Sequence, residues 1–169
     1  LSLHDALPIS VEDVKTEIAN GADVNAKDGN GDTAKDHARS NENPEIQKMA
    51  NVFDYVADKK TALLNAAREN ATPDAIRFLV ECGADVKAKN QNGANALMIA
   101  ASNTTYPEVI DVLAKAGIDV NAKSNESQTA LMYAARFNKN PEVVRALIKA
   151  GADVKATDGF FFGKGCLAA

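Results

Sequence analysis

The sequence predicts an all-α solenoid, in which short helix-turn-helix repeats stack side by side and are joined by hairpin-like loops. Three anchors recur in one register and predict this fold: a Gly-x-Asp-Val string, an alanine-rich stretch that begins with Ala-Leu, and a single proline. Each returns at a spacing of 34 residues, at Gly83, Gly117 and Gly151, at Ala62, Ala96 and Ala130, and at Pro73, Pro107 and Pro141. Self-similarity at such a period is typical of repeat proteins, whose units bury their apolar faces against their neighbours.

Length and composition limit the class of protein. The 169 residues are 46% apolar and 25% charged, which is enough chain and enough apolar content for one folded domain. The longest apolar runs, 96–101 and 130–135, have six residues, whereas a membrane-spanning helix needs about 18 or more. Two cysteines cannot support a disulfide scaffold, and a net charge of −4 does not fit a general nucleic-acid binder. We therefore expect no membrane span and no nucleic-acid partner.

The beginning of the chain does not follow the repeat pattern. Residues 1–9 have no counterpart elsewhere in the chain and resemble the translation of a sequencing-library adapter. We therefore expect natural sequence to begin near Ser10. Residues 10–28 are predicted to form an incomplete N-terminal repeat, because apolar residues at helical spacing precede Gly21, as they do before the glycines of the later copies.

The next unit, residues 29–58, is predicted to be an irregular and shortened repeat. Only 17 residues separate the proline of its second helix, Pro44, from the threonine that opens the following copy, Thr61. The long hairpin loop and the glycine stop are therefore missing. We interpret residues 52–60 as a compressed junction between two helix pairs.

Three regular repeats follow, at residues 59–91, 92–125 and 126–158. Each begins with a short alanine-rich helix, whose small side chains allow a neighbouring helix to approach closely. Thr61 and Thr129 stand where a hydroxyl can cap the start of this helix, which stabilises a helix by about 1 kcal/mol.

The second helix of a repeat has its own start and stop signals, which are clearest in the last copy. Asn140 can cap this helix and Pro141 suits its first position. Its apolar residues at helical spacing are Val143, Val144, Leu147 and Ile148. Gly151 is expected to end the helix in the left-handed conformation that favours glycine.

The end of the chain, residues 159–169, is predicted to be the start of a truncated repeat. Gly163 and Leu167 match the register in which the earlier copies begin, after two extra residues. The three phenylalanines at 160–162 would pack on the missing remainder of that repeat, or they arise from errors at the end of a sequencing read. The alternative is an aromatic binding patch. We expect the isolated fragment to self-associate through its uncovered end.

The repeat resembles the ankyrin repeat. The family pattern of a first-helix motif followed by a Gly-Ala-Asp-Val loop matches residues 127–135 with 151–154, and residues 93–101 with 117–121. The resemblance extends over about 11–158. Alanine replaces the usual proline and leucine or methionine replaces the usual histidine, so the family's hydrogen bonds between loops through that histidine are not available.

No catalytic or metal-binding constellation is predicted. His37 is the single histidine outside the adapter-like segment, and no serine or cysteine lies in a nucleophile motif. Residues 23–29 are a poor calcium loop because Lys27 occupies a ligand position, and residues 29–32 read as a loop turn. Cys82 is expected to be a small buried thiol. We expect no enzyme activity, no cofactor and no metal.

The resemblance implies a binding surface on the concave face, which consists of loop tips and the exposed side of the first helices. The residues it places there are Lys59, Lys60, Arg68, Glu69, Gln91, Asn92, Ala94, Ser102, Asn103, Asn125, Glu126, Gln128, Tyr133, Arg136 and Phe137. These residues vary between copies, whereas the anchors do not. Hot-spot reasoning places most of the affinity on Tyr133, Arg136 and Phe137.

The predicted function is therefore that of a non-catalytic scaffold, which binds another protein through its concave face. The alternative is a targeting or regulatory arm of a larger enzyme whose catalytic domain lies outside this sequence. We expect a cytoplasmic location and a monomer in the full-length context.

Overall fold

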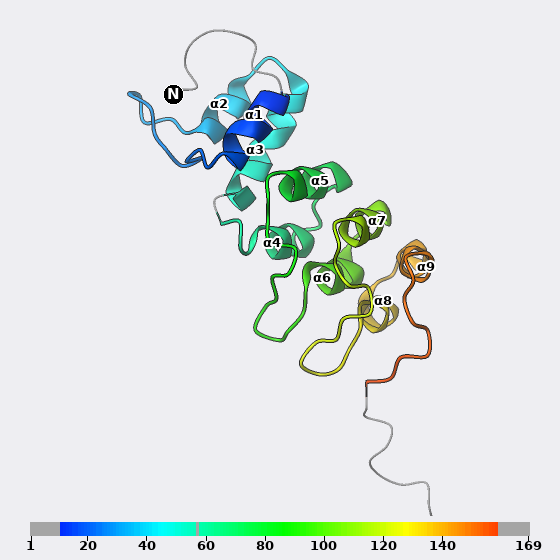
Figure 1. The fold of residues 1–169 in the computed structure, drawn as a ribbon. Helices are drawn as coiled ribbons and strands as arrows, with labels where there is room; N and C mark the ends of the chain where they lie inside the picture. The colour runs from blue at the N-terminus through cyan, green and yellow to red at the C-terminus, as the bar shows by residue number, and fades with distance from the viewer. Residues whose placement is uncertain (1–10, 57, 159–169) are drawn as a thin grey trace, which may run out of the picture.

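The computed structural model describes residues 11–56 and 58–158, which form nine α-helices and confirm the all-α solenoid (Figure 1). In chain order the helices are α1 Val11–Ala19, α2 Ala34–Ser40, α3 Pro44–Val56, α4 Ala62–Arg68, α5 Pro73–Glu81, α6 Ala96–Asn103, α7 Glu108–Lys115, α8 Ala130–Phe137 and α9 Pro141–Lys149. The expectations for residues 1–9 and 159–169 concern segments outside the described residues. None of the helices in the described part is long and apolar enough to cross a membrane.

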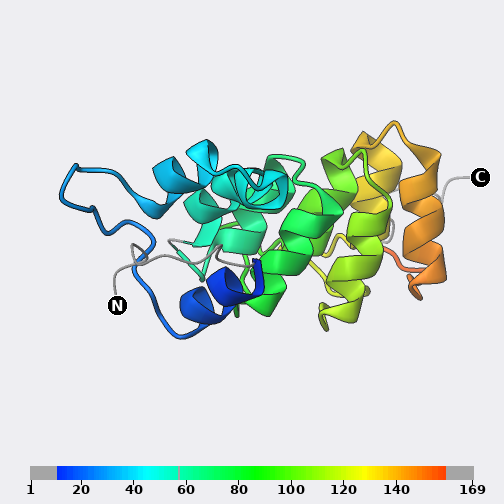
Figure 2. The same cartoon turned by 90° about the horizontal axis from the view of Figure 1, so that it is seen from above.

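Three helix pairs, α4/α5, α6/α7 and α8/α9, stack in sequence order. Figure 1 shows their first helices in one row and their second helices in another, with the loops after α5 and α7 extending from the row of first helices. Seen from above, the helices lie side by side along the stack (Figure 2). The core runs between the two rows and continues from pair to pair.

Small side chains allow the first helices to pack closely. Ala66, Ala100 and Ala134 occupy the same position in α4, α6 and α8, and each is completely buried. Leucines from the second helices fill the space beside them, and Leu113 and Leu147 are also completely buried. Because each pair of short helices buries these residues partly against the next pair, the stack is the unit of stability.

The helix starts follow the sequence signals with one exception. The Thr129 hydroxyl accepts a hydrogen bond from the Met132 N–H, and α8 is capped as predicted. Thr61 makes no such bond at the start of α4, so the prediction of a threonine cap there is wrong. Its hydroxyl instead donates to Asp58 Oδ2 over 2.7 Å, because the short connection from α3 brings that carboxylate within reach.

The second helix of the last repeat ends on a glycine as predicted, and only some of its apolar residues are buried. Gly151 follows α9 with a φ of +96°, a backbone conformation that side chains disfavour. Val143 and Leu147 are completely buried, while Ile148 is 48% exposed. Ile148, which the sequence places among the apolar residues at helical spacing, lies at the end of the stack, where no following helix covers it in the described part of the chain.

The shortened repeat is built differently from the prediction. Helix α3 continues to Val56, and Val52, Phe53 and Val56 are buried. The expected junction at 52–60 is therefore wrong in its first half, because these apolar side chains extend the helix by more than one turn. The connection to α4 is confined to the few residues that follow.

Helix α1 packs against α5 as well as α3, so the first helix contacts a repeat that is not its sequence neighbour. The Lys15 ammonium forms an ion pair with Glu81 and lies 5.8 Å from the centre of the Phe78 ring. The Lys59 ammonium donates to the Ile18 carbonyl over 3.2 Å and so connects the C-terminal end of α1 to the residues just before α4.

Asparagine side chains connect neighbouring repeats. Asn103 Nδ2 donates to the Arg68 carbonyl over 2.7 Å, and Asn125 Nδ2 donates to the Gln91 carbonyl over 3.1 Å. Asn138 Nδ2 donates to two carbonyls at the C-terminal end of α6, both over 3.0 Å. These bonds join residues about one repeat apart, and they connect the repeats where the family's histidine is absent.

Candidate interaction surface

The exposed side of the first helices forms a continuous surface, which we call the first-helix face. Its residues stand in three rows, because the 34-residue period places equivalent positions next to one another in the stack. The rows are Asn65, Ile99 and Tyr133; Arg68, Ser102 and Arg136; and Glu69, Asn103 and Phe137. All nine side chains are at least partly exposed.

An aromatic and cationic cluster occupies the α8 end of this face. The ring centres of Tyr133 and Phe137 are 6.1 Å apart and their planes are tilted by 42°. The Arg136 guanidinium lies 5.1 Å from the centre of the Phe137 ring, within the range of a cation–π interaction. Phe137 is nevertheless 52% exposed. The cluster therefore presents apolar and hydrogen-bonding surface together.

The structure places most of the predicted contact residues at the surface. The exposed residues are Lys60, Arg68, Glu69, Gln91, Asn92, Asn103, Asn125, Glu126, Arg136 and Phe137. Partly exposed are Lys59, Ser102, Gln128 and Tyr133. The loop tips are held in position, because Asn125 N–H donates to the Asn92 carbonyl of the neighbouring loop over 3.0 Å.

Two predicted contact residues are committed to the fold instead. Ala94 is only 3% exposed, because the Asn90 N–H donates to its carbonyl and turns the chain so that Ala94 lies at the base of the loop. Lys59 directs its ammonium to the Ile18 carbonyl, a contact that the sequence could not reveal because the two residues are 41 positions apart. We leave both residues out of the surface proposed below.

Two residues near this face were missed by the sequence reasoning. Ile99 is partly exposed and stands in the row of Tyr133, so the 34-residue period could have identified it. The Tyr55 hydroxyl donates to Glu69 Oε2 over 2.6 Å and fixes that carboxylate from α3. No local pattern predicts the second contact, because it depends on how the irregular repeat packs on α4.

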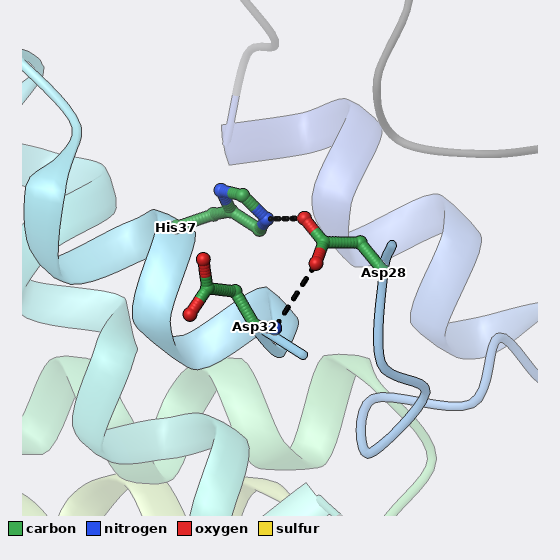
Figure 3. Close-up of side chains that lie close together, drawn as sticks. All are labelled: Asp28, Asp32 and His37. Atoms are coloured by element: carbon green, nitrogen blue, oxygen red, sulfur yellow. Dashed lines mark hydrogen bonds and ion pairs between the residues drawn. The ribbon is translucent and has the colours of Figure 1, made fainter. Parts of the chain in front are cut away.

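A separate polar cluster joins the loop before α2 to α2 itself (Figure 3). Asp28 Oδ2 is 2.9 Å from His37 Nε2, while Asp28 Oδ1 accepts hydrogen bonds from the N–H groups of Asn30 and Asp32 over 2.8 and 3.0 Å. The two backbone bonds, with His37 contributing less, lower the pKa of the Asp28 carboxyl. The ligand atoms of Asp28, Asp32 and His37 lie within 4.8 Å of one another.

This cluster has the internal bonds of a loop turn. Both Asp28 oxygens are already engaged by partners within the loop and α2, so the arrangement needs no cation to explain it. The Asp32 and His37 side chains are exposed, and exposed acidic groups in such turns are common without a metal. The cluster fits the loop turn that the sequence predicts for 29–32.

Two open grooves lie between the second helices. One groove separates α5 from α7 and another separates α7 from α9. Glu108 and Asp111 line both grooves, with Arg77 and Lys115 on one side and Arg145 on the other. The residues that line these grooves mix both signs of charge, and none of them is a histidine, cysteine or serine that could act as a nucleophile.

The repeat region matches the model of a known protein family. A family model described as ankyrin repeats (3 copies) matches residues 47–124 and 63–158, which together make up more than half of the chain. The match includes every helix from α4 to α9. No curated protein matches the sequence significantly.

Proposed function

The chain belongs to the ankyrin repeat family, and from this membership we propose that it is a non-catalytic module that binds a partner protein through the loop tips and the first-helix face. Ankyrin repeats generally mediate protein–protein interaction, and such domains are typically non-catalytic. The chemistry of the described surface supports this proposal, since its most distinctive group is a cluster for contact and not for catalysis.

The observation that carries the proposal is the exposed cluster on α8. A phenylalanine that is 52% exposed gains little from folding, so the stack itself does not require it at position 137. Aromatic and arginine side chains are the residues most often found at binding hot spots. Phe137 and Arg136 contact one another and Tyr133 lies beside them, so one partner pocket could engage all three.

The pattern of variation along the stack supports the same surface. The buried position at Ala66, Ala100 and Ala134 is constant, because any larger side chain there would separate the helices. The surface row beside it changes from Glu69 to Phe137. Packing fixes the first set and leaves the second free to match a partner.

Binding through this surface is tested by affinity capture with the complete protein, followed by measurement of the dissociation constant for the protein recovered. Truncation of Phe137 or Arg136 to alanine should weaken binding by about 1 kcal/mol or more each, which is about fivefold in the dissociation constant. The matched control variants are Tyr106→Ala and Arg77→Ala. Both control residues are exposed, and both lie away from the first-helix face.

The outcome distinguishes the faces of the molecule. Weaker binding in the first-helix variants together with unchanged binding in the controls supports the proposal. Unchanged affinity in Phe137→Ala and Arg136→Ala rejects the assigned face. Loss of binding in the control variants alone would place the binding site on the other side of the stack, near Tyr106 and Arg77.

The alternative function is that of a targeting or regulatory arm of a larger enzyme whose catalytic domain lies outside this sequence. It differs from the first proposal only in what the module is attached to, so the complete reading frame decides between them. The cytoplasmic location and the monomeric state of the full-length protein stay predictions, to be tested by imaging the tagged protein and by light scattering.

A further inference from the structure

The first helices of the three regular repeats carry no carboxylate. The only charged side chains in α4, α6 and α8 are those of Arg68 and Arg136. The second helices differ, because α5, α7 and α9 each carry acidic as well as basic residues. Among the loop-tip residues of the surface, Lys60 and Glu126 carry opposite charges. The row of first helices in Figure 1 therefore carries positive charge only, although the whole chain has a net charge of −4.

Neither arginine of this row forms an ion pair within the described part of the chain. On the second helices, by contrast, Arg77 and Arg145 each form an ion pair with an acid three residues earlier. Arg68 donates to Asn65 Oδ1 over 3.3 Å, which is long for a hydrogen bond. The Arg136 guanidinium lies over an aromatic ring. Both exposed guanidinium groups therefore keep N–H donors for a carboxylate from outside the fold.

We propose that the partner of the first-helix face presents an extended acidic segment, with one carboxylate for Arg68, one for Arg136 and apolar side chains between them. The inference rests on the proposed function, because it names the chemistry of the partner for the same face. Charge complementarity carries it, since guanidinium groups without an opposing acid attract carboxylates and repel basic segments. Arginine suits this role because its planar guanidinium can donate two parallel hydrogen bonds to one carboxylate.

The spacing of the two arginines favours a peptide over a small anion. Arg68 and Arg136 stand in one row, two repeats apart, with Ser102 of α6 between them. Packed helices lie about 8–10 Å apart, so the two positions are separated by about 16–20 Å along the stack. One phosphate or carboxylate cannot reach both. An extended chain rises about 3.3 Å per residue, so two acids about five or six residues apart match the two arginines.

Apolar side chains of the first-helix face stand in the rows beside the arginines. Ile99 of α6 is partly exposed and shares its row with Tyr133 of α8. At the α8 end, Phe137 is 52% exposed beside Arg136. A segment that runs along the stack from one arginine to the other passes these side chains. Apolar residues between its two acids can therefore cover them, which removes apolar surface of both molecules from water.

The two ends of the face should contribute unequally to the binding of such a segment. Glu69 directly follows Arg68, and its carboxylate, which accepts from the Tyr55 hydroxyl over 2.6 Å, repels an approaching acid. Helix α8 has no acid beside Arg136, and its aromatic pair adds contact area. We therefore expect Arg136 to contribute more of the affinity than Arg68.

Peptide selection on the complete chain tests the chemistry of the partner. The probe is a phage-displayed library of random peptides of about 12 residues, which is long enough to span both arginines when extended. We expect the selected peptides to be enriched in Asp and Glu, with two acids about five or six residues apart and apolar residues between them. Their dissociation constants, measured by fluorescence anisotropy, should rise with salt concentration because salt screens exposed charges.

Three variants assign the contacts of the selected peptides. Arg136→Ala should raise the dissociation constant by at least about fivefold, and Arg68→Ala should raise it by less. The matched control is Arg145→Ala, which should leave it unchanged, because this exposed guanidinium lies on α9 and already has an acid partner. Unchanged thermal unfolding midpoints show that the variants are folded. Arg136→Glu should reverse the preference, so that a peptide with lysine in place of its acid binds more tightly than the original.

The outcomes separate the acidic partner from the proposed function. Neutral or basic peptides that need Phe137 for binding reject the acidic segment and leave binding by the first-helix face standing. Peptides that bind Phe137→Ala and Arg136→Ala as tightly as the unsubstituted chain, but bind Tyr106→Ala more weakly, use another face and overturn both. An empty selection overturns the acidic segment, while affinity capture of a folded partner still decides the proposed function.

Discussion

Asn138 offers the sharpest test of how the repeats are connected, because one amide group joins two of them. Its Nδ2 donates to the carbonyls of Ala101 and Thr104 at the C-terminal end of α6, both over 3.0 Å. Its Oδ1 accepts from the Asn140 N–H over 2.8 Å, which shapes the turn into α9. Removal of the side chain by Asn138→Ala therefore deletes three hydrogen bonds at once.

The magnitude follows from these three bonds. Each intramolecular hydrogen bond contributes about 0.5–1.5 kcal/mol net, and the side chain is only partly buried, so water replaces some of what is lost. We expect Asn138→Ala to lower the free energy of unfolding by about 2–3 kcal/mol. Urea denaturation should show a lower midpoint with an unchanged slope, because the exposed surface area on unfolding is the same.

A second variant separates the two roles of Asn138. Asn138→Asp keeps the oxygen that accepts from Asn140 and loses both donors to α6, while it brings a carboxylate near two carbonyl oxygens. We expect it to destabilise at least as much as alanine does. The exposed neighbour Lys139 supplies the control, Lys139→Ala, with a change below about 0.5 kcal/mol. Equal free energies of unfolding for Asn138→Ala and Lys139→Ala would show that the three hydrogen bonds of Asn138 contribute no net stability.

Two further predictions concern a glycine and a carboxylate. Gly93 and Gly117 have φ values of +72° and +93°, so alanine at either position costs about 1–2 kcal/mol in backbone strain. A Cβ at Gly93 would also clash with the Asn125 side chain and would lie 2.9 Å from the Asn125 backbone nitrogen. Gly93→Ala should therefore lower the thermal unfolding midpoint more than Gly117→Ala does. Equal midpoints would show that Asn125 moves aside freely. The Thr61 hydroxyl lowers the pKa of the Asp58 carboxyl in the folded protein. The ionised Asp58 carboxylate therefore stabilises the fold at pH values above its pKa in the unfolded chain, and this contribution is lost as the pH falls through its pKa in the folded protein. Between pH 5 and pH 2 the free energy of unfolding should therefore fall less for Asp58→Asn than for the unsubstituted protein. An equal fall in both proteins would show that Asp58 does not contribute to the acid dependence of stability.

The fold could be predicted from the sequence because its strongest signals are local and repeated. Asn140 and Pro141 start α9, and Gly151 ends it, through contacts within a few residues. The cap at Thr61 failed for a different reason. Its hydroxyl had a competing acceptor in Asp58, which only the compressed connection from α3 brings close.

The irregular repeat was harder to predict because its contacts are not local. Val52, Phe53 and Val56 are buried and extend α3, although the regular repeats carry charged residues at the positions of Val52 and Val56. The packing of α1 on α5 depends on the same compression, and the ion pair between Lys15 and Glu81 has no signal in the pattern.

The candidate surface could be predicted in part. The period identifies the rows on the first helices, and Arg136 and Phe137 are exposed there. It does not tell loop tip from loop base, so Ala94 was placed at the surface although it is buried. The repeat period also does not show which polar side chains form hydrogen bonds within the fold, as Lys59 does with the Ile18 carbonyl.

The packing of α1 across the shortened repeat has a consequence for the order in which the molecule assembles. Within each of the pairs α6/α7 and α8/α9 a short loop joins the two helices, and the two pairs are neighbours in sequence, so they can form early at a low cost in chain entropy. The docking of α1 on α5 must wait until the intervening helices are in place, because its contacts close a far longer stretch of chain. Assembly should therefore begin in the C-terminal half and finish when the first helix docks, and native-state hydrogen exchange should find the amides of α1 among the first to open.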